Sequence, residues 1–224
     1  MKRTKLCDRI LPTYSKGEEI FNMVSHIVGG VIGIAVLVLC VVFAAIHGNG
    51  YGVVSSSIYG ATIIILYTMS SIYHGLNSDL KAKKVFQIID HCSIFLLIAG
   101  SYTPFCLCTL RENSTALGWS IFGIVWFLAI LGIVLNSIDL KKFKIFSMIC
   151  YLIMGWCIVF KVDVIYTSLG PAGFTLLLVG GIIYTIGAVL YGVGKKKKWM
   201  HSIFHLFCVA ATILQALCIM MYVV

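Results

Sequence analysis

The sequence MHSIFHLFCVAATILQALCIMMYV, residues 200–223, is long and apolar enough to cross a membrane as one helix, yet it carries two histidines. Spanning about 30 Å of hydrocarbon at about 1.5 Å per residue requires about 20 apolar residues. Ionisable groups inside such a span are costly unless they find partners, so they are candidates for a functional site. This stretch therefore predicts a membrane protein and also indicates where its chemistry lies.

Six other stretches meet the same requirement of length and hydropathy. They are residues 20–45, 53–74, 86–108, 117–136, 143–161 and 169–192. Only 11% of the 224 residues are charged, whereas a soluble domain has about 25%. The runs are continuously apolar and lack the alternation of lipid-facing β-strands. The sequence predicts an all-α integral membrane protein, a single domain over residues 1–224 with seven transmembrane helices and a cytoplasmic arm at residues 1–18.

Positive charge lies in alternate loops of this predicted bundle. All but Arg111 and Lys161 of the 17 lysines and arginines fall in the N-terminal arm or in the loops after the second, fourth and sixth spans. Cytoplasmic loops carry such an excess, which predicts a cytoplasmic N-terminus and an extracytoplasmic C-terminus. Because each charged cluster directly adjoins a span, topology explains the net charge of +9, and we expect no nucleic-acid partner.

Four ionisable residues from three different spans share one predicted depth. They are His74, Asp90, His201 and His205. The two α-helical rises from Lys198 to the last two histidines are about 4.5 and 10 Å, and the rise from Lys84 to Asp90 is about 9 Å. All four therefore lie just inside the cytoplasmic edge of the predicted bilayer.

The spacing of the histidines is typical of a metal site. His201 and His205 stand four residues apart, so both rings project from one helix face. A third imidazole from His74 would complete a three-histidine site with an open fourth position, the usual arrangement of catalytic zinc. Asp90 could then bond the metal's water or orient a ligand, and Ser70, one turn before His74, could support it. The alternative is a set of histidines that separately bond neighbouring carbonyls, but the common depth favours a shared site.

A second polar group begins the first span. Glu19, Asn22 and His26 share a helix face and enter from the same cytoplasmic side. They either close the mouth of the site, act as a further acid/base pair, or are interfacial caps. His91 points about 100° away from Asp90 on a helix, which favours a packing or hydrogen-bonding role. Elsewhere on the first span, Gly29 and Gly33 form a small-xxx-small pair that is typical of close helix packing.

These motifs together resemble the hemolysin III family, bacterial relatives of the progestin and adipoQ receptors. The resemblance rests on Glu19-x-x-Asn22-x-x-Ser25-His26, Ser70-x-x-x-His74, Asp90-His91 followed by Ala99-Gly100-Ser101-Tyr102-Thr103-Pro104, and His201-x-x-x-His205. It covers nearly the whole chain, with one motif group per key helix in the expected order. It implies a seven-helix bundle in the plasma membrane, the inner membrane of a bacterium, with zinc near the cytoplasmic face.

The resemblance also implies roles for individual residues. His74, His201 and His205 correspond to the zinc ligands, Asp90 to the partner of the zinc-bound water, and Ser70 to a supporting hydroxyl. The wider superfamily includes alkaline ceramidases, which implies metal-dependent hydrolysis of lipid amides or esters, with a membrane lipid as substrate or ligand. The family name instead implies haemolysis.

Two functions follow from these expectations. Three clear ligands favour a zinc hydrolase. The alternative is a non-enzymatic membrane sensor, receptor or pore-forming cytolysin in which zinc is structural. Structural zinc usually has four protein ligands, and the ionisable groups of the chain gather at one end rather than crossing a span. The sequence defines no oligomeric state.

Overall fold

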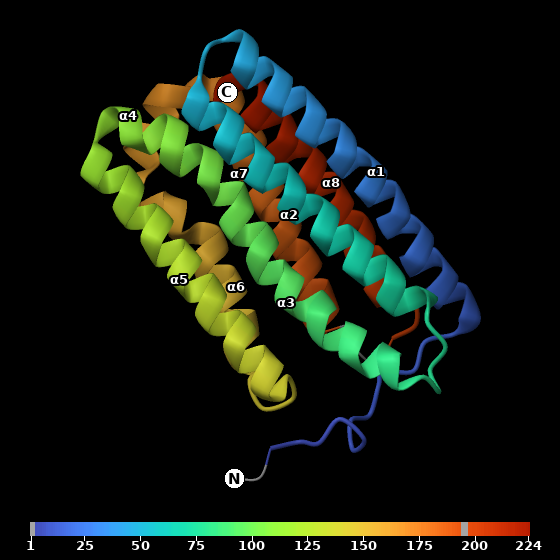
Figure 1. Ribbon diagram of the computed structural model, residues 1–224. Coiled ribbons are helices and arrows are strands. Elements are labelled where there is room, and N and C mark those ends of the chain that lie inside the picture. Colours follow the sequence, from blue (N-terminus) through green and yellow to red (C-terminus); the bar gives the residue numbers. More distant parts are fainter. Residues whose placement is uncertain (1–2, 194–196) are drawn as a thin grey trace.

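The computed structural model describes residues 3–193 and 197–224, and within those ranges it is helical and contains no strand. The helices stand side by side in one bundle (Figure 1). In chain order they are α1 (Lys16–Ile46), α2 (Gly50–Gly75), α3 (Lys81–Pro104), the π-helical η1 (Phe105–Leu110), α4 (Arg111–Asn113), α5 (Thr115–Asp139), α6 (Lys144–Trp156), the 3₁₀-helical η2 (Cys157–Lys161), α7 (Val162–Val193) and α8 (Met200–Tyr222). The predicted loop charges at Lys2, Lys195 and Lys196 lie outside the described residues.

Six stretches of the described chain are long and apolar enough to cross a membrane. They are Lys16–Ile46, Gly50–Gly75, Lys81–Asn113, Thr115–Asp139, Lys144–Gly192 and Met200–Tyr222. Large apolar side chains along α1 and α5 are exposed, among them Val31 and Phe127. Exposed apolar surface of this extent is expected where a helix faces lipid rather than water. The protein is thus a multi-pass membrane protein.

The fifth of these stretches combines two of the predicted spans and is 49 residues long. Its helix is interrupted at Gly170, whose φ of 65° and ψ of 177° are not helical. The Lys144 ammonium lies 5.9 Å from the centre of the Tyr191 ring, and the Trp156 indole donates a hydrogen bond of 2.9 Å to Thr185. Since the first residues of α6 meet the last of α7, the part of α7 after Gly170 runs antiparallel to α6, and the chain turns at Gly170.

The segments predicted to be cytoplasmic meet at one end of the bundle. Hydrogen bonds of 2.8, 2.7 and 2.6 Å join Thr4 to Asp139, Lys84 to Cys7, and Trp199 to Glu18. The N-terminal arm therefore crosses the ends of α3 and α5, and the chain before α8 contacts the start of α1. This places the positively charged segments together, while their orientation in the cell stays a prediction.

Glycines let α1 and α2 approach closely along their length. A Cβ atom at Gly29 would lie 2.7 Å from the Tyr67 ring, and one at Gly33 would lie 2.6 Å from Ile63. The small-xxx-small pair therefore packs α1 against α2 inside the molecule, as predicted. This contact holds the first turn of α1 beside the last turn of α2, where the polar residues lie.

Candidate metal centre

Three histidines from two helices converge at the charged end of the bundle. His74 is in the last turn of α2, and His201 and His205 are in the first two turns of α8. The Nε2 atoms of His74 and His201 are 3.2 Å apart, and those of His201 and His205 are 3.0 Å apart. Each ring offers one ligand atom to a group whose atoms all lie within 4.8 Å of one another.

The donor set fits a zinc ion. Two nitrogens bound to one tetrahedral zinc at about 2.0–2.1 Å lie about 3.3 Å apart, close to the observed Nε2 separations of 3.0 and 3.2 Å. His74 and His205 are buried, with 3% and 1% of their surface exposed. Burying three imidazoles with their nitrogens facing one another is costly without a shared partner, and a cation supplies one.

The Glu19 carboxylate contacts His74 on the side of the ring away from the cluster, and the Lys83 ammonium contacts Glu19 in turn. The Nδ1 atom of His74 lies 2.6 Å from Glu19 Oε2, so Glu19, predicted as an accessory residue, does contact the cluster. The second oxygen of Glu19 accepts a 2.7 Å hydrogen bond from Lys83 Nζ. Lys83 is only 3% exposed and also donates to the Leu76 carbonyl at 2.8 Å. A buried lysine is expected to have such a partner.

Aromatic rings cover the other two histidines. Tyr14 of the arm stacks on His201 with ring centres 4.9 Å apart and an interplanar angle of 17°. His26 of α1 stacks on His205 at 3.7 Å and 18°. Burial raises the pKa of the Tyr14 phenol well above its ordinary value, so this ring stays neutral. Each ring restricts the orientation of the imidazole below it.

Two predicted accessory residues are buried without hydrogen-bond partners. The Asn22 amide and both ring nitrogens of His26 are enclosed and unpaired among the described residues, as are the Nδ1 atoms of His201 and His205. His26 contacts the cluster through its stack on His205, and the Asn22 backbone lies within hydrogen-bonding reach of the His205 ring. Buried groups of this kind usually bond ordered water.

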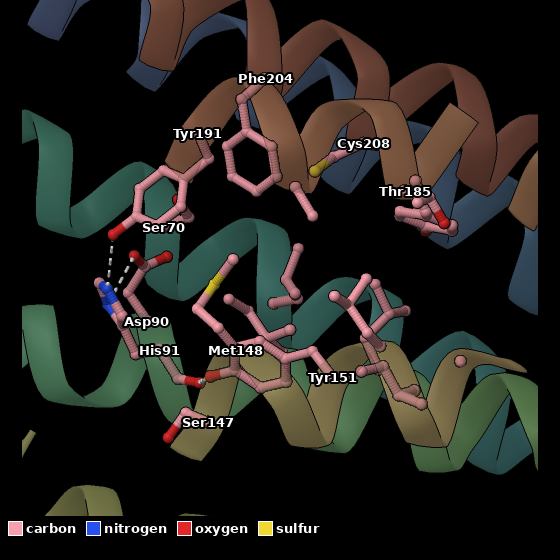
Figure 2. Close-up of a pocket in the computed structure, with 18 of the residues that line it drawn as sticks. Ser70, Asp90, His91, Ser147, Met148, Tyr151, Thr185, Tyr191, Phe204 and Cys208 are labelled. Carbon is pink, nitrogen blue, oxygen red and sulfur yellow. Dashed lines mark hydrogen bonds and ion pairs between the residues drawn. The ribbon is translucent and has the colours of Figure 1, made fainter. Parts of the chain in front are cut away.

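Asp90 and Ser70 line a cavity that begins at the cluster (Figure 2). The cavity has a volume of about 170 Å³, and His201 and His205 form part of its wall. Ser70 is buried on α2, and its hydroxyl makes no hydrogen bond with another described residue. Asp90 shares the cavity but makes no hydrogen bond to the three histidines within the described ranges. Five of the predicted site residues therefore line one cavity, namely His26, Ser70, Asp90, His201 and His205. His74 does not line it but contacts it through its grouping with His201 and His205.

His91 lines this cavity and contacts other residues of its wall, not the three histidines. Its Nδ1 lies 2.9 Å from the Gln87 carbonyl and 3.6 Å from the Asp90 carboxylate, and its Nε2 lies 3.3 Å from the Tyr191 hydroxyl. In Figure 2, dashed lines join the His91 ring to the Asp90 carboxylate and to the Tyr191 hydroxyl. The hydrogen-bonding role predicted for His91 is confirmed.

Sequence reasoning missed Tyr14 and Lys83. Lys83 counted only as loop charge, although it precedes Asp90 by seven residues and so shares its helix face. That spacing was a usable signal. Tyr14 lies in the arm before α1, where no periodicity indicates the direction of a side chain.

Comparisons with known proteins identify the family of this chain. The family model described as haemolysin-III related matches residues 14–216. The chain belongs to this family. It is 39% identical to Hemolysin-3 of Bacillus cereus over 206 residues, which is 92% of each chain. It is also 39% identical to the Hemolysin-3 homolog of Bacillus subtilis, over 92% of this chain and 95% of that one.

More distant relatives are animal proteins. The human monocyte to macrophage differentiation factor is 27% identical over 164 residues, covering 70% of this chain and 66% of its own. The adiponectin receptor protein of Drosophila melanogaster is 24% identical over 86% of this chain and 48% of its own. The matches therefore extend from bacterial hemolysin III proteins to the receptor branch, in line with the resemblance stated from the motifs.

Proposed function

We propose that this hemolysin III protein is a zinc-dependent intramembrane hydrolase that cleaves lipid amides or esters at the cytoplasmic leaflet. The observation that carries the proposal is that two members of the three-imidazole cluster, His201 and His205, line a mostly apolar cavity that Ser70 and Asp90 also line. A metal centre on the wall of an apolar cavity suits a substrate with a polar head and a hydrocarbon tail.

The proposal includes seven membrane crossings. A helix of 49 residues would be about 73 Å long at 1.5 Å per residue, more than twice the thickness of the hydrocarbon. The turn at Gly170 and the antiparallel course of α6 and α7 support two crossings within this stretch. With positive charge on the inner side, the N-terminus is cytoplasmic, the C-terminus is outside, and the site lies at the inner leaflet of the plasma membrane.

His74, His201 and His205 would hold the zinc. When bound, zinc polarises a carbonyl and lowers the pKa of water at an open coordination position. Structural zinc sites usually use four protein ligands and catalytic sites three. No fourth histidine, cysteine or carboxylate belongs to this group in the described residues, which favours the catalytic alternative.

The cavity residues would perform the remaining steps. The Asp90 carboxylate accepts a proton from the attacking water and returns it to the leaving amine or alcohol, because it is the acidic group in the cavity wall. The Ser70 hydroxyl donates a hydrogen bond to the substrate carbonyl oxygen as charge develops there. Tyr14, stacked on His201, excludes cytoplasmic water from this side.

A second cavity provides space for a hydrocarbon chain. It has a volume of about 270 Å³ and continues the first cavity toward the other end of the bundle. Six residues line both cavities: Ser101, Tyr102, Gly155, Trp156, Gly181 and Gln215. The combined space runs between α3, α6, α7 and α8, so a lipid tail can extend away from the cluster.

Fatty-acid release by the purified, zinc-loaded protein tests the proposal. With ceramide and ester-linked lipids in mixed micelles, we expect the parent to release free fatty acid and His205→Ala to release none. Asp90→Asn should keep its zinc but lose about 10²-fold or more in turnover, the usual contribution of a general acid–base group. Asp163→Asn is the matched control, since Asp163 is exposed at the start of α7, far from the cluster.

Full activity of Asp90→Asn would contradict the mechanism. The names of the Bacillus relatives suggest haemolysis as the second candidate function. Planar-bilayer conductance and red-cell lysis, measured on the same preparations, distinguish the two. Lysis that survives in Asp90→Asn, without fatty-acid release from the parent, would favour the cytolysin.

A further inference from the structure

We infer that Glu19, paired with Lys83, is a positioning residue that fixes the tautomer and orientation of His74 for metal binding. This inference rests on the proposed metal site and concerns how the protein tunes it. It replaces the three roles considered for Glu19 from the sequence, which were closing the mouth of the site, acting as an acid/base partner and capping the helix at the membrane interface.

The two nitrogens of His74 face different partners. Nδ1 lies 2.6 Å from Glu19 Oε2, and Nε2 lies 3.2 Å from His201 Nε2. An ionised carboxylate only accepts hydrogen bonds, so Nδ1 carries the proton. The lone pair on Nε2 then points into the cluster. Metal-binding histidines commonly have this arrangement, in which a carboxylate orients the ring and raises its basicity as a ligand.

Lys83 neutralises the partly buried Glu19 carboxylate, which is 20% exposed. It bonds the other oxygen of Glu19 at 2.7 Å and so leaves Oε2 to His74. Its second bond, at 2.8 Å, goes to the Leu76 carbonyl, two residues after His74. The Lys83 ammonium also lies 5.3 Å from the centre of the Tyr73 ring. These contacts join α1, α2 and α3 around one imidazole.

The neighbouring Glu18 has different hydrogen-bond partners, so its role can be separated from that of Glu19. Glu18 accepts hydrogen bonds from the Ser15 and Trp199 backbone amides, at 2.9 and 2.6 Å, and does not contact His74. Glu18 therefore caps the N-terminus of α1 together with Ser15, and its hydrogen bond to Trp199 connects α1 to the chain before α8. Of these two adjacent carboxylates, Glu19 alone acts on a candidate ligand.

Zinc affinity of full-length protein provides the test. Glu19→Gln keeps the size of the side chain but removes its charge, and we expect competition with a chromogenic chelator to show about 10- to 100-fold weaker zinc binding, as for other outer partners of metal ligands. In cobalt-loaded protein, the visible absorption bands should shift, since they report ligand geometry. Glu112→Gln is the matched control, because Glu112 is exposed and contacts Arg111 instead.

A second variant, Glu19→Asp, distinguishes an effect of the carboxylate on zinc binding from a general effect of the substitution on folding. It retains the carboxylate but shortens its reach, so we expect zinc affinity between those of the parent and Glu19→Gln. It also serves as the test if Glu19→Gln does not fold. If whichever variant folds has the zinc affinity and the cobalt spectrum of the parent, the inference about Glu19 is wrong. The proposed metal site itself would not be affected by that result. A parent protein that binds no zinc would contradict the proposed function itself.

Discussion

At the scale of single residues, the segment from Tyr14 to His26 contacts all three imidazoles. Each candidate ligand has its own contact from this segment: His74 with Glu19, His201 with Tyr14, and His205 with His26. One contact is a hydrogen bond and two are ring stacks. A site held in this way needs little rearrangement to bind a cation.

Tyr14 is expected to slow the exchange of the metal. A ring stack contributes about 0.5–1.5 kcal/mol, so Tyr14→Ala should accelerate zinc loss to excess EDTA by roughly 2- to 10-fold. Tyr14→Phe keeps the ring and should retain the parent rate, because the stack on His201 needs only the aromatic ring. Equal rates of zinc loss in the parent and Tyr14→Ala would argue against a covering role.

The residues of the cluster could be predicted from two patterns in the sequence. The spacing of residues along a helix shows which side chains share a helix face, and the distance from flanking lysines shows how deep they lie in the bilayer. His201 and His205 needed only their spacing of four residues, and His74 needed its distance from Lys81. The side-chain contacts of Glu19 with His74 and Lys83 depend on how three helices meet. No pattern within one helix contains that information.

At the scale of helices, α1 and α2 pack backbone against backbone at Gly60. A Cβ atom at Gly60 would lie 2.5 Å from the Cβ and 2.7 Å from the Cα of Leu37. The second of these is a backbone atom that cannot rotate away. A side chain at Gly60 therefore requires the two helices to separate, which would disturb the shared end where His74 meets Glu19.

Gly60→Ala should destabilise the bundle by about 1–3 kcal/mol, the usual cost of overpacking. Thermal unfolding in detergent, followed by circular dichroism, should show a lower midpoint. Gly123→Ala on α5 is the matched control, since a Cβ there meets nothing within 4 Å, and it should leave the midpoint unchanged or slightly higher because alanine favours helix. Equal midpoints for the two variants would contradict this packing.

Helix positions were predictable to within a few residues, whereas helix irregularities were not. Apolar length identified residues 143–161 and 169–192 as separate spans, and the structure joins them through η2 and a turn at Gly170. It also continues α3 into the π-helical η1 after Pro104. Hydropathy reports where a chain is apolar, but not how its backbone hydrogen bonds shift at a proline or glycine.

At the scale of the whole molecule, the number of crossings decides the positions of the two ends. With seven crossings the termini lie on opposite sides of the membrane, and with six they lie on the same side. The contacts among the arm, α3, α5 and the chain before α8 place the basic segments together. The positive-inside rule then predicts that this end is cytoplasmic.

Reporter fusions test the crossings. Alkaline phosphatase fused after Val224 should be active, because it folds only outside the cytoplasm, and a cytoplasm-dependent fluorescent protein at the same position should be dark. Fusions in the loop after Asp139 provide the control with the opposite expected pattern. A C-terminus on the cytoplasmic side would contradict seven crossings.

The zinc content of the purified protein tests the central claim most directly. We predict one zinc ion per chain in the parent and in His47→Ala, since His47 is exposed at the far end of α1, and a loss of stoichiometric zinc in His201→Ala. A parent without stoichiometric zinc, or a His201→Ala variant that retains it, would contradict the account.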